Sequence, residues 1–171
     1  MDLAEYKGIY VIAEQFEGKL RNVSFELLGQ ARVLADTIGD EVGAILIGKD
    51  VKPLAQDLIA HGAHKVYVYD DPKLENYNTT AYAKVICDFF HEEKPNVFLV
   101  GATNIGRDLG PRIANSLQTG LTADSWLKSF ARTTARRWVQ FARTYSRNRK
   151  LIPMPKVKLS KRLLTSATLI S

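Results

Sequence analysis

The chain has 171 residues, of which 46% are hydrophobic and 25% charged, which suits one folded domain and excludes a disordered or disulfide-scaffold protein. Cys87 is the single cysteine, and the three scattered histidines lack the spacing of zinc ligands, so no metal site is expected. The acidic start and the short apolar runs indicate no targeting segment and no membrane span, which predicts a cytoplasmic protein.

The charge of the chain changes sign at Asp124. Residues 1–124 hold all 18 acidic residues and 12 basic residues, whereas residues 125–171 hold 12 basic residues and no acidic one. The regular spacing of apolar residues is also lost from Ser125 onward. We therefore predict an α/β domain over residues 1–124 and a basic tail over residues 125–171 that is disordered or non-native.

Up to Asp124, segments typical of strands and helices alternate. Short β-branched and aromatic runs predict four buried strands at residues 8–13, 42–47, 66–69 and 97–100. Apolar residues at three- and four-residue spacing predict a helix after each strand. Ser24 is the expected N-cap of the first helix and Gly39 its end, Asp50 is the expected cap of the second, and Asn78 introduces the third. Four successive strand and helix pairs predict a doubly wound parallel sheet, because parallel neighbours need crossover helices.

The loop after the fourth strand, residues 101–112, is the most informative part of the chain. In an open parallel sheet the ligand end lies at the carboxyl ends of the strands, and a helix N-terminus there favours an anion. This loop combines small residues with polar and charged ones that could face a phosphate or a docking partner. These candidates are Thr103, Asn104, Arg107, Asp108 and Arg112.

A purely structural interpretation of the same loop stays open. In that interpretation Gly101 and Gly110 serve tight packing, Arg107 and Asp108 form a solvated pair, and Pro111 lies in the first turn of the helix. Elsewhere, Cys87 is expected to be a core thiol, and His61 and His64 to be surface residues near a helix end. No phosphate-loop, nucleophile or paired-carboxylate motif is present, so no catalytic residue is predicted.

The run GATNIGRDLGPRIA at residues 101–114, followed by TGLTAD at 119–124, resembles the signature of the alpha subunit of electron transfer flavoproteins. The segments KGIYVIAE at 7–14, ELLGQA at 26–31 and AHKVY at 63–67 resemble the same family in the same order. The resemblance covers about 120 residues and implies a Rossmann-like domain of the adenine-nucleotide alpha hydrolase type.

The family implies a heterodimer in which this domain packs on the beta subunit, while a second alpha-subunit domain binds FAD and passes electrons from dehydrogenases to an acceptor. The FAD-contacting motifs of the family lie in that second domain, so none is carried over to this chain, and no cofactor is expected for it alone. We interpret the tail after Asp124 as the product of truncation with a shifted reading frame. The alternative function is a stand-alone adenine-nucleotide-binding module. The basic tail predicts only nonspecific contact with nucleic acid.

Overall fold

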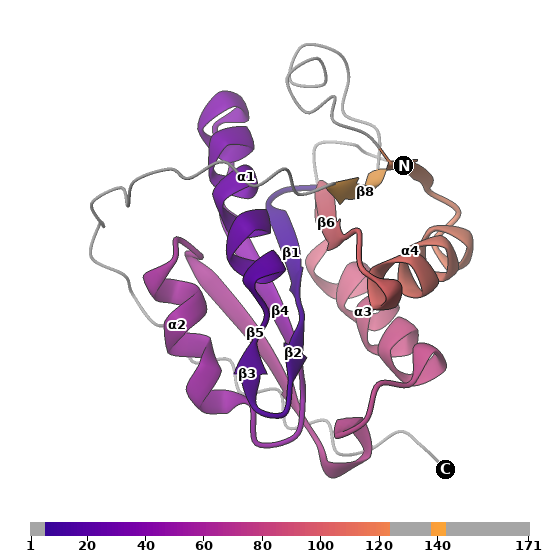
Figure 1. Cartoon of the computed structure of the whole chain (residues 1–171). Helices are drawn as coiled ribbons and strands as arrows, with labels where there is room; N and C mark the ends of the chain where they lie inside the picture. The colour runs from indigo at the N-terminus through magenta and orange to yellow at the C-terminus, as the bar shows by residue number, and fades with distance from the viewer. Residues whose placement is uncertain (1–5, 124–137, 143–171) are drawn as a thin grey trace.

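The computed structural model describes residues 6–123 and 138–142, and its centre is a parallel β-sheet (Figure 1). Within these residues, six strands pair in the spatial order β5-β4-β1-β6-β8-β7, and β2 and β3 form a separate antiparallel hairpin. The strands of the sheet are β1 (Ile9–Ala13), β4 (Val42–Gly48), β5 (Lys65–Asp70), β6 (Val97–Gly101), β7 (Gly120–Ala123) and β8 (Trp138–Ala142). The hairpin strands are β2 (Gln15–Phe16) and β3 (Lys19–Leu20).

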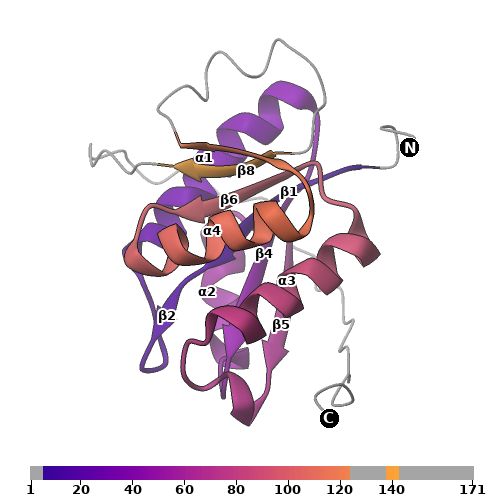
Figure 2. The ribbon, with the colours of Figure 1, turned by 90° about the vertical axis from the view of Figure 1, so that its right-hand side faces the viewer.

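Helices cover both faces of this sheet. They are α1 (Asn22–Ile38), α2 (Ala55–Ala60), α3 (Thr79–Glu93) and α4 (Asn104–Ser116), with the short 3-10 helices η2 (Lys52–Leu54) and η3 (Pro72–Leu74). Helices α1 and α2 lie on one face, and α3 and α4 lie on the other (Figures 1 and 2). The fold is therefore the three-layer, doubly wound α/β arrangement that the sequence predicts.

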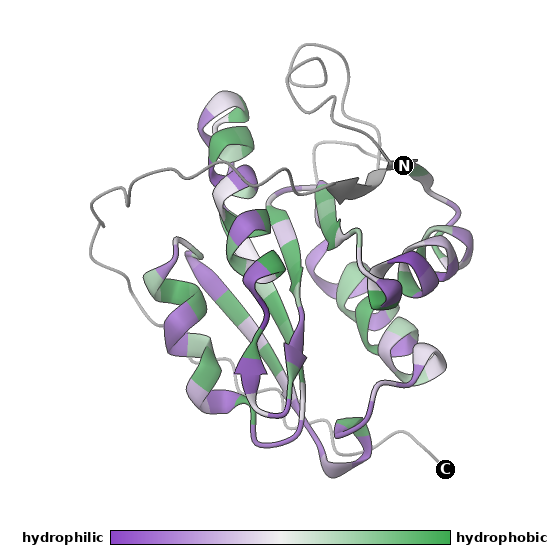
Figure 3. Cartoon of the chain, viewed as in Figure 1, coloured by the Kyte–Doolittle hydropathy of each residue, from purple (hydrophilic) through white to green (hydrophobic). Residues whose placement is uncertain are grey.

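Strand β1 divides the core into two parts because successive side chains point to opposite faces of a sheet. Ile9 and Val11 pack in the cluster on the α1 side, whereas Tyr10 and Ile12 pack in the cluster on the α3 side. All five residues of the strand are buried, and the apolar strands lie between helices that are striped with apolar and polar residues (Figure 3). Complete burial of a side chain such as that of Leu27 or Phe89 stabilises the fold by about 1.5–3 kcal/mol.

The strand order reverses between β1 and β6. The chain runs from β1 outward through β4 to β5, and then returns to pair β6 with the other side of β1. In open α/β sheets, such a reversal places a crevice at the carboxyl ends of the two strands, where ligands commonly bind. The loop after β6 therefore lies at the edge where the sequence predicts it.

Two predicted helix caps are wrong. Helix α1 begins one turn earlier than expected, with Arg21 as its N-cap, and Ser24 is fully buried inside the helix. Asp50 does not cap the second helix; it takes a positive φ of 54°, and its backbone N–H donates to the Asp70 carboxylate. The predicted end of α1 at Gly39 and the cap of α3 by Asn78 are confirmed.

Most of the predicted tail lies outside the described residues. Within residues 125–171, the structure describes strand β8, whose backbone pairs in parallel with β6 and β7. The sequence predicts no regular element there, nor does it predict β7. The domain boundary at Asp124 and the disordered or non-native character of the tail stay predictions.

Candidate functional site

The candidate site lies where β1 and β6 end, at the reversal of strand order. Glu14 directly follows β1, and Thr103 follows β6 and serves as the N-cap of α4. The Thr103 hydroxyl oxygen accepts a hydrogen bond of 3.0 Å from the Gly106 backbone N–H, which satisfies one of the free donors at the start of the helix. Thr103 thus fixes the N-terminus of α4 at the ligand edge of the sheet.

The same Thr103 hydroxyl contacts Glu14. It donates a hydrogen bond of 2.7 Å to Glu14 Oε1, which joins segments 89 residues apart in the chain. Glu14 is only 5% exposed, and within the described residues its Oε2 atom is buried without a hydrogen-bond partner. Burial raises the pKa of this carboxyl, while the hydrogen bond from Thr103 and the charge of Arg21 oppose that rise.

Ser24 holds the backbone of Glu14 in place. The Glu14 N–H donates to the Ser24 hydroxyl oxygen at 2.8 Å, and the hydroxyl donates in turn to the Glu14 carbonyl at 3.0 Å. Ser24 is fully buried, so the pair anchors the end of β1 to the first turn of α1. This contact explains why a serine that looks like a helix cap lies inside the helix instead.

Two glycines allow these segments to approach one another. A Cβ atom at Gly101 would lie 2.7 Å from Glu14 Oε1 and 2.9 Å from Val23 Cγ2. A Cβ atom at Gly106 would lie 1.8 Å from the carbonyl oxygen of Gly101, which is a backbone atom that cannot easily move. The small residues of this loop therefore serve close packing, and the group that approaches Gly101 is the chain's own Glu14.

Asp108, one turn further along α4, contacts the segment that precedes α3. Its Oδ2 atom accepts a hydrogen bond of 2.8 Å from the Tyr77 hydroxyl and another from the Thr79 hydroxyl. These two hydrogen bonds, Thr79 first, lower the pKa of the Asp108 carboxyl. Arg112 Nη1 donates to the Thr80 hydroxyl at 3.1 Å, so α4 and the start of α3 are joined at two points.

The structural interpretation of this loop predicts an ion pair between Arg107 and Asp108. Among the described residues this pair is absent, because Asp108 accepts hydrogen bonds from Tyr77 and Thr79 instead. Pro111 also lies beyond the first turn, since α4 begins at Asn104. Asn104 and Arg107 are exposed, and neither side chain makes a hydrogen bond or ion pair with another described residue. The structure thus separates the five candidates: Thr103, Asp108 and Arg112 make internal contacts, and Asn104 and Arg107 face solvent.

Sequence reasoning missed Glu14, Tyr77 and Thr79. Glu14 carries a usable signal, because an acidic residue that directly follows a buried strand lies at the ligand edge of a parallel sheet. Tyr77 and Thr79 carry none, because only the packing of α3 beside α4 brings them to Asp108.

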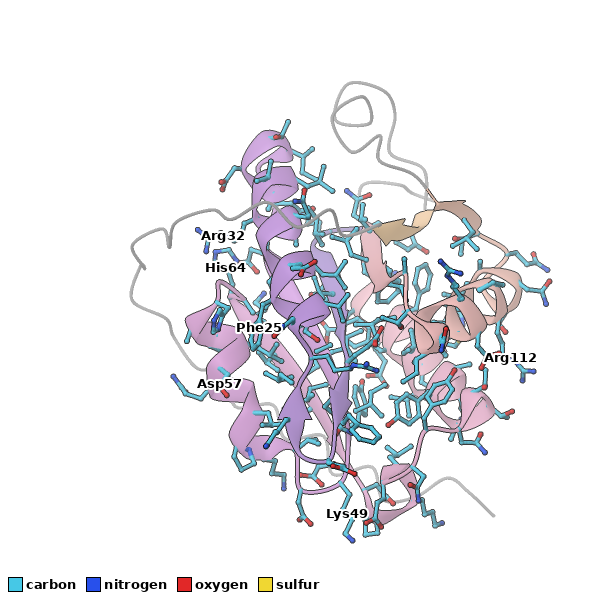
Figure 4. The ribbon with its side chains drawn as sticks, viewed as in Figure 1. Phe25, Arg32, Lys49, Asp57, His64 and Arg112 are labelled. Carbon is cyan, nitrogen blue, oxygen red and sulfur yellow. The ribbon has the colours of Figure 1, made fainter. Side chains whose placement is uncertain are left out.

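The two histidines that the sequence places near a helix end have structural contacts. His64 Nδ1 accepts a hydrogen bond of 3.0 Å from the Val42 N–H, and His61 Nδ1 lies 2.7 Å from the Asp57 carbonyl oxygen. Figure 4 shows His64 and Asp57 on the α1–α2 side of the sheet and Arg112 on the α3–α4 side. Cys87 is half-buried, and burial raises the pKa of its thiol, which disfavours the reactive thiolate.

Two further features are absent from residues 6–123 and 138–142. No group of three or more potential metal-ligating side chains lies close enough together to hold an ion in this part of the chain. In the same residues, no helix combines the length and apolar character needed to cross a membrane.

Comparison with known proteins gives one consistent family. Residues 9–157 match the electron transfer flavoprotein domain. An electron transfer flavoprotein subunit alpha of Megasphaera elsdenii is 94% identical over 124 residues, which are 72% of this chain and 37% of that protein. The alpha subunit of Thermoanaerobacterium thermosaccharolyticum is 58% identical over 120 residues, 70% of this chain and 36% of that protein.

A third relative has a different name. The acryloyl-CoA reductase electron transfer subunit beta of Anaerotignum propionicum is 54% identical over 123 residues, 72% of this chain and 34% of that protein. The chain therefore spans about a third of the length of these relatives.

Proposed function

This chain belongs to the electron transfer flavoprotein domain family, and we propose that it forms the first α/β domain of an electron transfer flavoprotein alpha subunit. In that role it docks on the beta subunit of a cytoplasmic heterodimer, which passes electrons from dehydrogenases to an acceptor through FAD. The domain is a carrier component and performs no catalytic step. The 94% identity to an alpha subunit supports the family role, and the loop at the start of α4 supports the docking role.

The FAD of this family does not fit the described residues at the place where an open parallel sheet holds a nucleotide. The carboxylate of Glu14 lies there, almost completely buried against the N-cap of α4. Its negative charge opposes the diphosphate of FAD. We therefore assign FAD to another part of the assembly and assign no electron-transfer step to a residue of this chain. The purified, desalted chain should show no flavin absorbance, and retained absorbance would contradict this assignment.

One observation carries the docking proposal: the loop residues divide into two groups. Thr103 and Asp108 are held by internal hydrogen bonds, whereas Asn104 and Arg107 are exposed and make no such contact with the other described residues. Arg112 is also exposed, and it is positioned by Thr80. Helix α4 fixes the backbone of these residues, so a partner has only their side chains to order on binding.

The experiment measures binding of the full chain to the beta subunit of the Megasphaera elsdenii flavoprotein by calorimetry. Arg107→Glu should weaken binding at least about tenfold while leaving the melting temperature unchanged, because the Arg107 side chain pairs with no other described residue. The matched control is Lys52→Glu, which reverses an exposed charge on η2 and should leave binding unchanged.

Arg112→Glu separates docking from structural support. Arg112 donates to Thr80, so its reversal should lower the melting temperature as well as the affinity. If Arg107→Glu and Arg112→Glu both bind the beta subunit as tightly as the unaltered chain, α4 does not form the docking surface. If the unaltered chain does not bind, it does not act as a docking domain on its own.

A further inference from the structure

The place where β1 and β6 end has features of an anion site. It lies where strand order reverses, and the 13-residue helix α4 begins there with its N-terminus toward the carboxyl edge of the sheet. Backbone N–H groups and the helix dipole favour negative charge at such a position, and nucleotide-binding sheets commonly place phosphate there.

In this chain the carboxylate of Glu14 lies against the residue that caps this helix. Glu14 Oε1 accepts the hydrogen bond of 2.7 Å from Thr103, the residue that caps α4. The absent side chain of Gly101 provides the space, because a Cβ atom there would lie 2.7 Å from the same oxygen. The loop therefore leaves room for the side chain of Glu14.

The second carboxylate oxygen indicates that this arrangement is more than a local hydrogen bond. Glu14 is 5% exposed, and Oε2 is enclosed with no partner among the described residues. Leaving a buried polar atom unsatisfied is unfavourable, so a fold that needed only packing here is better served by an apolar side chain. The helix dipole of α4 partly offsets the cost of burying a negative group beside its start, and that group repels a second anion.

We propose that the N-terminus of α4 is an anion site whose resident anion is the chain's own Glu14, which excludes nucleotide phosphates from the crevice that this fold otherwise offers. The proposal accounts for a loop with small residues at a helix N-terminus that packs against an acid of the same chain. It also argues against the stand-alone adenine-nucleotide module and does not depend on the docking role.

Chemical rescue tests the proposal in the full chain. Glu14→Ala removes the resident carboxylate and leaves a space beside the Thr103 hydroxyl. Formate or inorganic phosphate should then raise the melting temperature of this variant by about 2–4 °C relative to chloride at equal ionic strength. The unaltered chain and Glu17→Ala, which removes an exposed acid from the hairpin turn, should show no such difference.

Two further variants separate the role of the Thr103 hydroxyl from that of the Glu14 charge. In Glu14→Ala/Thr103→Ala the rescue should be lost, because the donor to the anion is gone. Glu14→Gln keeps the shape of the side chain and tests whether the fold tolerates loss of the charge. The proposal is overturned if formate and phosphate fail to stabilise Glu14→Ala or to restore its folding, or if they stabilise the unaltered chain equally.

Discussion

The hydroxyl of Tyr77 donates a hydrogen bond of 2.8 Å to Asp108 Oδ2, and this contact joins the segment before α3 to the outer side of α4. Thr79 donates to the same oxygen, so one carboxylate oxygen accepts two hydroxyl groups from the neighbouring segment. Helices α3 and α4 cover the same face of the sheet (Figure 2), and Asp108 therefore helps to hold the two helices together.

Asp108→Ala should lower the melting temperature of the chain at neutral pH, because it removes the acceptor of both hydroxyl groups. The pKa of this carboxyl is lowered in the folded state, so its contribution is present above its unfolded value of about 3.9 and is lost as pH falls through the folded value. The difference in melting temperature from the unaltered chain should therefore shrink below about pH 4.

Asp88→Ala is the matched control for this measurement. Asp88 forms an exposed ion pair of 2.9 Å with Lys84 on α3, and exposed pairs of this kind contribute about 0–1 kcal/mol. Its melting temperature at pH 7 should stay close to that of the unaltered chain. Equal melting temperatures of Asp108→Ala and the unaltered chain at pH 7 would show that the Tyr77 and Thr79 contacts contribute no stability.

Gly106→Ala should destabilise the fold by about 1–3 kcal/mol, the usual cost of forcing extra volume into a packed site. The added methyl group would lie 1.8 Å from the Gly101 carbonyl oxygen, so the loop after β6 must shift away from α4. Gly29→Ala on α1 is the opposite case, because nothing lies within 4 Å of its added Cβ atom. There alanine should stabilise the helix by about 0.5–1 kcal/mol.

Urea unfolding of both glycine variants measures the two effects, with a lower midpoint for Gly106→Ala and a higher one for Gly29→Ala. A midpoint for Gly106→Ala equal to that of the unaltered chain would show that the loop can rearrange at no cost.

The sequence predicts the layers of this fold because apolar residues recur with the period of each element. Leu27 and Leu28 mark the buried side of α1, and Ile113 that of α4; all three are fully buried. The predicted cap of the second helix is wrong because a tertiary contact replaces it. The Asp70 carboxylate accepts a hydrogen bond from the Val51 N–H across 19 residues, and the local sequence pattern does not encode that contact.

The candidate site, too, could be predicted from the sequence only in part. Its position after β6 follows from the general rule for parallel sheets, and Thr103 and Asp108 lie where that rule places them. Their partners depend on which strands and helices are neighbours, which the sequence alone does not establish. Strand β7 has the sequence GLTA, which lacks the run of β-branched and aromatic residues that predicts the four buried strands.

Phe89→Ala should cost about 3–5 kcal/mol, because the ring is fully buried and its removal leaves a cavity. The ring of Phe89 lies 5.0 Å from that of Tyr10 and 4.8 Å from that of Tyr67, in edge-on contacts that the cavity would also remove. Phe16→Ala removes a ring that is 63% exposed and should change stability by less than about 0.5 kcal/mol. Similar urea midpoints for the two variants would contradict the assignment of Phe89 to the core.

Glu14→Gln should reveal a pH dependence opposite in sign to that of Asp108. Burial raises the pKa of the Glu14 carboxyl above its unfolded value of about 4.3. The contribution of this shift to stability is therefore fully present below about pH 4 and is lost as pH rises through the folded value. Glutamine does not titrate, so the melting temperature of the unaltered chain relative to Glu14→Gln should fall as the pH rises above about 4.

Thr103→Val tests the cause of that dependence. The Thr103 hydroxyl lowers the pKa of Glu14 by donating to its carboxylate, so its removal should move the pH step upward. Because Thr103 also caps α4, the informative quantity is the difference between Thr103→Val and Glu14→Gln/Thr103→Val, in which the lost cap cancels. A step that stays at the same pH in this pair would mean that the 2.7 Å contact does not control the charge of Glu14. If the difference in melting temperature between the unaltered chain and Glu14→Gln does not change with pH, the Glu14 carboxyl is not buried in the folded chain.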